Sequence, residues 1–288
     1  MGKNDQKKLA EAFRRMHHGP HLLLLPNAWD AMSARIFAAA GFEAIATTSG
    51  GVAWALGYPD GEQAPWREVA AATARIAGCV DVPVTADIET GYGETSGQVA
   101  ENVAEIIAAG AVGINLEDGL HGAATPIRDI ADAAERIRAA RDAASRAGVP
   151  IVINARSDLY LRKIGDDASR FAETVRRAEA YAAAGADCFY PFGLRDPATI
   201  AALAKAVPLP LNVTGRAGMP GAAELEALGV RRVTIASAPT LMVLSLLRQI
   251  AEDLRRTGRF DGLDPALKHP DAQRLFERDA RQVTRPRP

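Results

Sequence analysis

Two pairs of carboxylates stand where apolar runs of this chain end. Asp87 and Glu89 follow one short apolar run, and Glu117 and Asp118 follow the next. Near-continuous apolar runs are typical of buried parallel strands. We therefore expect several carboxylates to gather at one edge of a sheet.

Carboxylates that converge in this way raise one another's pKa unless a cation lies among them. Oxygen ligands without a nearby His or Cys favour Mg²⁺ or Mn²⁺ over zinc. The alternative is that these acids only cap helices and complement the helix dipole.

The elements that must position these groups repeat every 25 to 40 residues or so, as a short apolar run, a polar turn and an Ala-rich helical pattern. The predicted strands are 22–25, 44–48, 82–86, 112–116, 151–155, 188–191, 209–213 and 233–236. The predicted helices are 30–40, 66–79, 95–109, 130–147, 168–184, 196–206, 221–228 and 238–257, with a further helix at 5–18.

Eight such units predict an α/β fold of the (β/α)₈ barrel type. A doubly wound open sheet usually carries a Gly-rich phosphate turn after its first strand, and residues 25–30 contain no glycine. We expect residues 1–258 to form one barrel with its N-terminal helix, and residues 259–288 to form a helical or polar tail.

Composition excludes several classes of protein. The chain has 288 residues, 48% of them hydrophobic, and a net charge of −1, which fits a large enzyme-like domain and offers no basic surface for nucleic acid. No run approaches the roughly 18 apolar residues of a membrane span. Two cysteines, Cys79 and Cys188, without disulfide or metal spacing, predict a cytoplasmic protein.

Working residues of a barrel lie at the carboxyl ends of its strands. Arg156 is one of them; it could hold a substrate carboxylate, or form a structural ion pair with Asp158 or Glu117. The expected turn of Ser49, Gly50 and Gly51 offers backbone N–H groups for an anion, although a Gly pair also suits a tight loop. The other strand-end polar residues are Asn27, Asp30, Thr47, Thr48, Asp87, Glu89, Glu117, Asp118, Asn154, Asp158, Tyr190, Asn212, Thr214 and Ser237.

Six segments resemble the isocitrate lyase / phosphoenolpyruvate mutase superfamily in order and spacing. They are residues 25–30 (LPNAWD), 47–50 (TTSG), 57–60 (GYPD), 86–93 (ADIETGYG), 115–118 (NLED) and 154–158 (NARSD). The resemblance implies a (β/α)₈ barrel, often with its last helix exchanged within a homodimer or homotetramer. It also implies a bound Mg²⁺ (or Mn²⁺) and a small carboxylate substrate that reacts next to an enolpyruvate.

The same resemblance assigns roles to residues of this chain. It implies that Asp87 is the main metal-site acid, with Glu89 and Glu117 around the metal's water shell. The substrate-binding candidates are Thr48, Ser49, Gly50, Gly51, Asp87, Arg156 and Asn212. The catalytic candidates are Asp60, Glu117, Arg156, Tyr190 and His121, the last two as proton donors.

One departure from the family bears on specificity. Family members that cleave isocitrate or methylisocitrate carry a loop with Lys, Cys, Gly and His after the fourth strand, and this chain has no lysine between Lys8 and Lys163. We therefore expect a simpler lyase, for oxaloacetate-type decarboxylation or for cleavage of a small substituted malate. The alternatives are a P–C bond enzyme of the phosphonopyruvate type and a barrel that binds a 2-oxo acid without turnover.

Helix 238–257 carries an apolar face that includes Leu241, Leu244 and Leu247. Exchange of this helix between subunits would bury that face, and packing on the chain's own strands predicts the same pattern.

Overall fold

The computed structural model describes residues 2–120, 126–264 and 267–277. All strand pairs within these ranges are parallel, apart from one isolated antiparallel bridge. The strands are β1 (Leu23–Leu25), β2 (Asn27–Ala28), β3 (Ile45–Thr47), β4 (Val84–Asp87), β5 (Gly113–Glu117), β6 (Val152–Ser157), β7 (Cys188–Pro191), β8 (Asn212–Thr214) and β9 (Arg232–Thr234).

The strands follow one another around a barrel. One sheet has the order β2-β3-β4-β5-β6-β7 and the other the order β1-β9-β8. The chain passes from β1 to β2 through Pro26, which has no N–H for a ladder hydrogen bond. At the other junction, Phe189 and Leu211 form a parallel bridge between β7 and the start of β8. The predicted eight-strand α/β fold is confirmed, with β1 and β2 sharing the first strand position.

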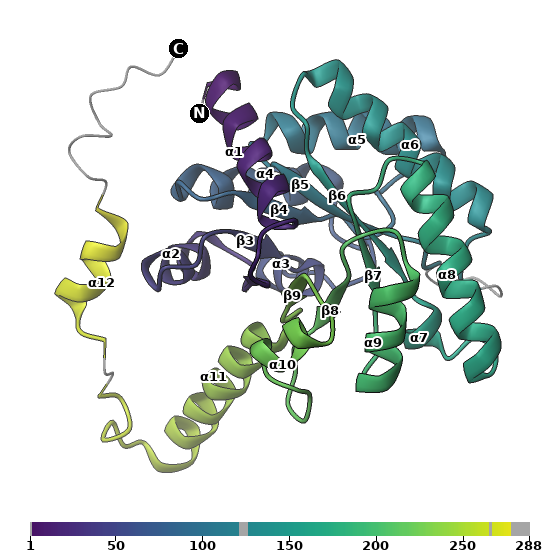
Figure 1. The fold of residues 1–288 in the computed structure, drawn as a ribbon. Coiled ribbons are helices and arrows are strands. Elements are labelled where there is room, and N and C mark those ends of the chain that lie inside the picture. The colour runs from purple at the N-terminus through teal and green to yellow at the C-terminus, as the bar shows by residue number, and fades with distance from the viewer. Residues whose placement is uncertain (1, 121–125, 265–266, 278–288) are drawn as a thin grey trace.

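Most of the helices cover the outside of the strands, whereas the last two, α11 (Ala238–Thr257) and α12 (His269–Phe276), lie away from them (Figure 1). The others in the described ranges are α1 (Lys3–Met16), α2 (Ala31–Ala39), α3 (Ser49–Leu56), α4 (Trp66–Cys79), α5 (Ser96–Ala108), α6 (Ile130–Ala147), α7 (Leu159–Arg162), α8 (Asp167–Ala183), α9 (Pro197–Ala206) and α10 (Ala222–Ala227). The nine predicted helices are present with ends that differ by at most two residues. The short helices α3 and α7 lack an apolar periodicity long enough to predict them.

Side-chain caps fix where several helices begin. Asp30 accepts a hydrogen bond from the backbone N–H of Ser33 at the start of α2, and Thr95 accepts one from Gln98 at the start of α5. In both cases the third helical residue bonds back to the cap, which completes a capping box.

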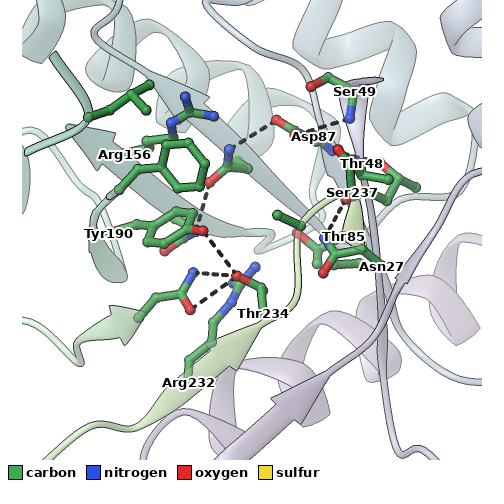
Figure 2. A pocket seen from close by; sticks show the side chains of 18 of the residues that line it. Asn27, Thr48, Ser49, Thr85, Asp87, Arg156, Tyr190, Arg232, Thr234 and Ser237 are labelled. Carbon is green, nitrogen blue, oxygen red and sulfur yellow. Dashed lines mark hydrogen bonds between the residues drawn. The ribbon is translucent and has the colours of Figure 1, made fainter. Parts of the chain in front are cut away.

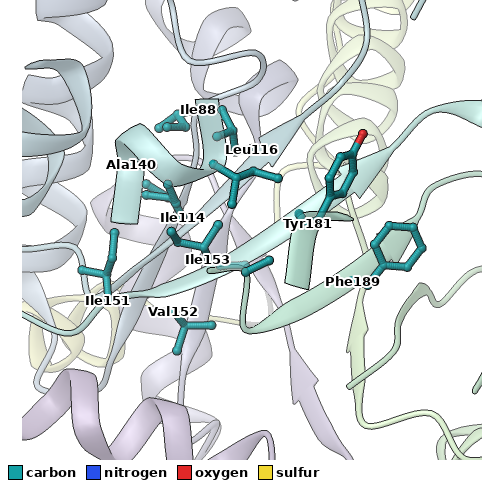
Figure 3. Close-up of a cluster of buried hydrophobic side chains, with 14 of the residues drawn as sticks. Ile88, Ile114, Leu116, Ala140, Ile151, Val152, Ile153, Tyr181 and Phe189 are labelled. Atoms are coloured by element: carbon teal, nitrogen blue, oxygen red, sulfur yellow. The ribbon is translucent and has the colours of Figure 1, made fainter. Parts of the chain in front are cut away.

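Alternation along the strands separates an apolar outer layer from a polar interior. On β5, the side chains of Ile114 and Leu116 belong to the buried hydrophobic cluster of Figure 3, whereas Asn115 lines the cavity described below. On β6, Ile153 and Asn154 differ in the same way. Because successive strand residues point to opposite faces, the apolar layer packs against the helices and leaves polar groups inside the barrel.

Helix α1 closes the amino-terminal end of the barrel. Its Phe13 is fully buried, and a Cβ on Gly113 at the start of β5 would lie 2.8 Å from the Phe13 ring. Gln6 donates hydrogen bonds to the carbonyl groups of Ile107 and Ala111 at 2.7 and 3.0 Å. The additional helix predicted at 5–18 therefore begins two residues earlier and packs against the barrel.

Helix α11 runs away from the strands (Figure 1), and Thr240 is its one buried residue within the described chain. The prediction that this helix packs on the chain's own strands is therefore wrong. Helix α12, in the predicted tail, contacts α2, where Arg35 donates to the carbonyl groups of Leu275 and Glu277. No helix in the described ranges is long and apolar enough to cross a membrane.

Candidate active site

A cavity of about 460 Å³ opens at the carboxyl ends of the strands and extends into the barrel (Figure 2). Its lining draws on every strand position of the barrel, and most of its side chains are polar. The lining residues are Asn27, Ala46, Thr47, Thr48, Ser49, Asp60, Thr85, Asp87, Asn115, Asn154, Arg156, Leu161, Arg162, Tyr190, Phe192, Asn212, Arg232, Thr234, Ala236 and Ser237.

Asp87, the last residue of β4, is held by hydrogen bonds from several elements. Its Oδ1 accepts from Asn115 Nδ2 at 2.9 Å and from the N–H of Glu89 at 3.4 Å. Its Oδ2 accepts from the N–H of Ser49 at 3.2 Å. The backbone N–H of Asp87 in turn donates to Thr47 Oγ1 at 2.8 Å. The carboxylate is therefore oriented before any ligand arrives.

Glu89 lies behind Asp87, buried and outside the cavity lining. Its oxygens accept from the N–H of Glu62 at 3.0 Å and from the Tyr92 hydroxyl at 2.9 Å. Glu62 Oε1 accepts in return from the N–H groups of Thr90 and Tyr92. This reciprocal bonding fastens the loop that carries Asp60 to the loop after β4.

Glu117 and Arg156 form an ion pair at the ends of β5 and β6, with 2.6 Å between Arg156 Nη1 and Glu117 Oε2. Arg156 Nε also bonds Asp158 Oδ1 at 2.7 Å, and the guanidinium stacks 3.9 Å from the Phe192 ring centre. Burial and the charges of Asp158 and Asp87 raise the pKa of Glu117, and the Arg156 ion pair opposes this shift. The structural ion pair anticipated for Arg156 is present, and its side chain still lines the cavity.

The expected Ser49-Gly50-Gly51 turn is wrong: these residues form the first turn of helix α3, with Thr48 as the N-cap. Thr48 and Ser49 line the cavity, whereas Gly50 and Gly51 lie behind them. A Cβ on Gly50 would stand 3.0 Å from Asp60 Oδ2, so the absent side chain lets Asp60 approach α3.

Asp60 lines the cavity from the loop after α3. Partial burial, followed by the charges of Glu89 and Asp87, raises the pKa of its carboxyl group. This crowding of carboxylates is the electrostatic condition that a bound cation relieves.

Tyr190 and Asn212 also line the cavity, and Tyr190 lies across it from Ser49 in Figure 2. The Tyr190 hydroxyl lies 2.5 Å from Thr214 Oγ1 and accepts from Thr234 Oγ1 at 3.4 Å. Burial raises the pKa of Tyr190, so its hydroxyl keeps its proton at neutral pH. The amide of Asn212 contacts Thr234 Oγ1 only at 3.5 Å.

The polar groups of two strand-end residues, Asn27 and Asp118, form hydrogen bonds within the protein. Asn27 donates to the carbonyl group of Thr47 at 2.8 Å and accepts from the N–H of Ile235 at 2.8 Å. Asp118 faces away from the cavity, where it accepts from Tyr181, Arg177 and the N–H of Asp158. His121, a candidate proton donor, lies outside the described residues.

The donor set fits a hard divalent ion held partly by water. No three His, Cys, Asp or Glu side chains in the described ranges converge on a site of protein ligands alone. Asp87 and Asp60 nevertheless bring carboxylates to the cavity lining, beside the neutral polar side chains of Asn115 and Thr47. Mg²⁺ commonly keeps several waters and takes one or two carboxylates, so Asp87 suffices as the anchoring ligand.

Sequence reasoning missed the deep residues Thr85 and Arg232 and the stacking residue Phe192. Thr85 and Arg232 precede the strand ends by two residues, and the alternation of strand side chains could have placed them inside the barrel. No comparable signal marks Phe192, because its position follows from the tertiary contact with Arg156.

The phosphoenolpyruvate phosphomutase family model matches residues 13–255, which contain every described residue of the cavity lining. The chain belongs to this family. It is thereby an enzyme of the isocitrate lyase / phosphoenolpyruvate mutase superfamily, whose members include lyases and mutases.

Relatives within the superfamily differ in reaction. A proposed phosphonomutase from Burkholderia cenocepacia J2315 is 45% identical with a TM-score of 0.81, over 85% of this chain and 99% of that one. Oxaloacetate decarboxylase from Rhodopseudomonas palustris (strain BisA53) is 31% identical, over 85% of this chain and 83% of its own length. The structure of 2,3-dimethylmalate lyase is 27% identical in sequence with a TM-score of 0.82, over 93% of this chain and 94% of that one.

Proposed function

We propose that this enzyme is a divalent-metal-dependent lyase for a small 2-oxo or 2-hydroxy di- or tricarboxylic acid, and that it acts through an enolate. The observation that carries the proposal is the preorganised Asp87 carboxylate, held by Asn115 and Ser49 in a polar cavity that also contains Arg156. Decarboxylation of oxaloacetate and cleavage of a substituted malate are the two reactions that fit it best.

A bound Mg²⁺ or Mn²⁺ would supply Lewis-acid polarisation of the substrate's 2-oxygen. Asp87 would hold the ion, and the buried carboxylates Glu89 and Glu117 would add negative potential behind it. Because Asn115 and Ser49 already fix the Asp87 oxygens, little reorganisation accompanies the reaction.

Arg156 is positioned to bind the substrate's carboxylate. Its two ion pairs and its stacking on Phe192 hold the guanidinium plane in one orientation at the cavity wall. A guanidinium fixed in this way favours planar, hydrogen-bonded recognition of a carboxylate. The protonated Tyr190 hydroxyl, beside Arg156 on the neighbouring strand β7, can donate a hydrogen bond to the enolate or relay a proton to it.

The similarity to oxaloacetate decarboxylase and to 2,3-dimethylmalate lyase supports this substrate class. The phosphonomutase similarity favours a second candidate, a P–C bond enzyme acting on a phosphonopyruvate-type substrate. A barrel that binds a 2-oxo acid without turnover is the third possibility, because the loop acid of the family's isocitrate-type lyases is absent.

Proton NMR in D₂O with Mg²⁺ tests these alternatives. The substrates are oxaloacetate, 2,3-dimethylmalate, 2-methylisocitrate, isocitrate, phosphonopyruvate and 2-oxoglutarate. Deuterated pyruvate formed by the wild type, lost in Asp87→Asn and kept in the exposed-surface control Asp142→Asn, would support the lyase. Turnover of phosphonopyruvate alone would select the P–C enzyme, and binding without product would select the non-catalytic barrel.

We also propose that α11 is exchanged between subunits of a homodimer or homotetramer. Its exposed apolar residues are Leu241, Met242, Val243, Leu244, Leu246 and Leu247. On the barrel itself, Leu24 of β1 is 39% exposed, and Met32 and Ile36 of α2 are also exposed. We call Leu24, Met32 and Ile36 the seat, because an apolar helix from a second subunit would cover these three side chains.

A further inference from the structure

Arg232 carries a guanidinium group at the closed end of the active-site cavity. It lies on β9, is 1% exposed, and lines the same cavity as Asp87. Within the described chain it makes no ion pair, and its Nε has no hydrogen-bond partner. The guanidinium carbon lies 5.9 Å from the centre of the Phe13 ring, a cation–π contact that supplies no anion. A buried charge without an anionic partner is costly and points to a ligand.

Among the described residues, the one hydrogen-bond contact of the Arg232 side chain is with a neutral group. Arg232 Nη1 lies 3.4 Å from His17 Nε2. His17 Nδ1 lies 2.8 Å from the carbonyl oxygen of Phe13, so Nδ1 carries the proton and Nε2 accepts. Burial and the nearby Arg232 lower the pKa of His17 to about 3. His17 therefore orients Arg232 without balancing its charge.

The groups that act electrostatically on Arg232 leave its charge largely uncompensated. They are Cys188, Tyr190 and Asp87. Burial raises the pKa of Cys188 to about 12 and also raises that of Tyr190, so both are neutral at pH 7. Asp87 is the one carboxylate of the three, and its oxygens already accept from Asn115 and Ser49.

Two other polar atoms of the cavity lining also lack hydrogen-bond partners in the described structure. Thr85 Oγ1 and Asn154 Oδ1 are buried, have no hydrogen-bond partner in the described structure, and belong to residues that line the cavity. Arg232 stands two residues before Thr234 on β9, about 7 Å deeper along the strand. In Figure 2, Arg232 lies below Thr234 and Tyr190 on the side away from Ser49.

We propose that Arg232 and Thr85 form an anion subsite that receives the second carboxylate of a dicarboxylic substrate. This inference rests on the proposed function, since it extends the substrate from the Asp87 and Arg156 end of the cavity toward its closed end. Arg232 and the Thr85 hydroxyl donate to the carboxylate oxygens, and Asn154 Oδ1 accepts from a substrate hydroxyl or a bridging water. The cavity of about 460 Å³ has room for such an acid.

Binding of a matched pair of ligands tests the subsite without requiring turnover. 2-Oxoglutarate and 2-oxovalerate have the same number of carbons and differ in whether the far end is a carboxylate or a methyl group. Isothermal titration calorimetry with Mg²⁺ is expected to show that the wild type prefers 2-oxoglutarate by about tenfold or more. Arg232→Met is expected to abolish the preference and to leave 2-oxovalerate binding within about twofold.

Two further variants keep the test decisive if Arg232→Met does not fold. Arg232→Lys, which keeps the charge, is expected to retain part of the preference, and Thr85→Val is expected to weaken 2-oxoglutarate binding alone. A wild type without preference, or folded variants that keep the full preference, would overturn the subsite. These outcomes are separate from the proposed function, which fails if the wild type turns over no acid of the panel.

Discussion

The backbone N–H of Ser49 donates a hydrogen bond to Asp87 Oδ2 at 3.2 Å, which joins the first turn of α3 to the end of β4. The helix N-terminus, which favours negative charge, thus holds a carboxylate of the protein itself. In this structure the N–H of Ser49 is therefore already engaged by Asp87. The role of α3 is to orient Asp87, and substrate recognition falls to the groups around it.

Removal of the Asp87 charge should abolish turnover without unfolding the protein. Asp87→Asn keeps the shape of the side chain but removes the anionic anchor for a divalent ion. We expect turnover, measured by pyruvate formation, to fall by about 10²–10³-fold or more. Asp142→Asn, an exposed acid on α6, is the matched control and should retain full activity. Equal activity of Asp87→Asn and the wild type would contradict the proposed role.

Gly51 provides a packing test of the α3 position. A Cβ there would lie 2.7 Å from Thr240 Oγ1 and 2.8 Å from Trp29 Cβ. We expect Gly51→Ala to lower the free energy of unfolding by about 1–3 kcal/mol in urea denaturation. Gly78→Ala on α4, where nothing lies within 4 Å, should instead leave stability unchanged or raise it by up to about 1 kcal/mol. The reverse order would show that α3 is not tightly packed.

Local sequence patterns predicted the barrel well, because each βα unit carries its own pattern of apolar and turn residues. Apolar runs and Gly residues after the helices marked the units, and the predicted helices 66–79 and 130–147 coincide with α4 and α6. The polar residues at the strand ends were also predictable, since Asp87, Arg156 and Tyr190 all line the cavity.

The sequence did not predict which side chains of the site bond to one another. The sequence places Glu89 and Glu117 around the water shell of a metal held by Asp87. In the structure, Glu89 bonds to Glu62 and Tyr92, and Glu117 pairs with Arg156. Such partners are distant in sequence and meet only when the loops fold over the strands. Strand alternation could have placed Arg232 inside the barrel, but its lack of an ion-pair partner depends on which distant side chains surround it and is not visible in the sequence.

His17 should make stability depend on pH. Its folded pKa is about 3, whereas an unfolded histidine titrates near 6.5, so the unfolded state binds more protons between these values. Stability must therefore fall as the pH drops below 6.5, by at most about 1.4 kcal/mol per pH unit from this group. Denaturation of His17→Gln between pH 7 and pH 4 should show a shallower decline than the wild type. Parallel curves would show that His17 does not titrate in this way.

A charge on the apolar face of α11 should separate the subunits. Leu247 is 60% exposed in the isolated chain, and in the exchanged arrangement it would be buried on a second subunit. We expect the wild type to elute as a dimer or tetramer in size-exclusion chromatography with light scattering, and Leu247→Glu to shift toward monomer. Leu24→Glu, at the seat on β1, should have the same effect because it blocks the other side of the contact. Leu263→Glu, an exposed leucine outside α11, is the matched control and should leave the oligomer intact. A wild type that stays monomeric at all concentrations would contradict helix exchange.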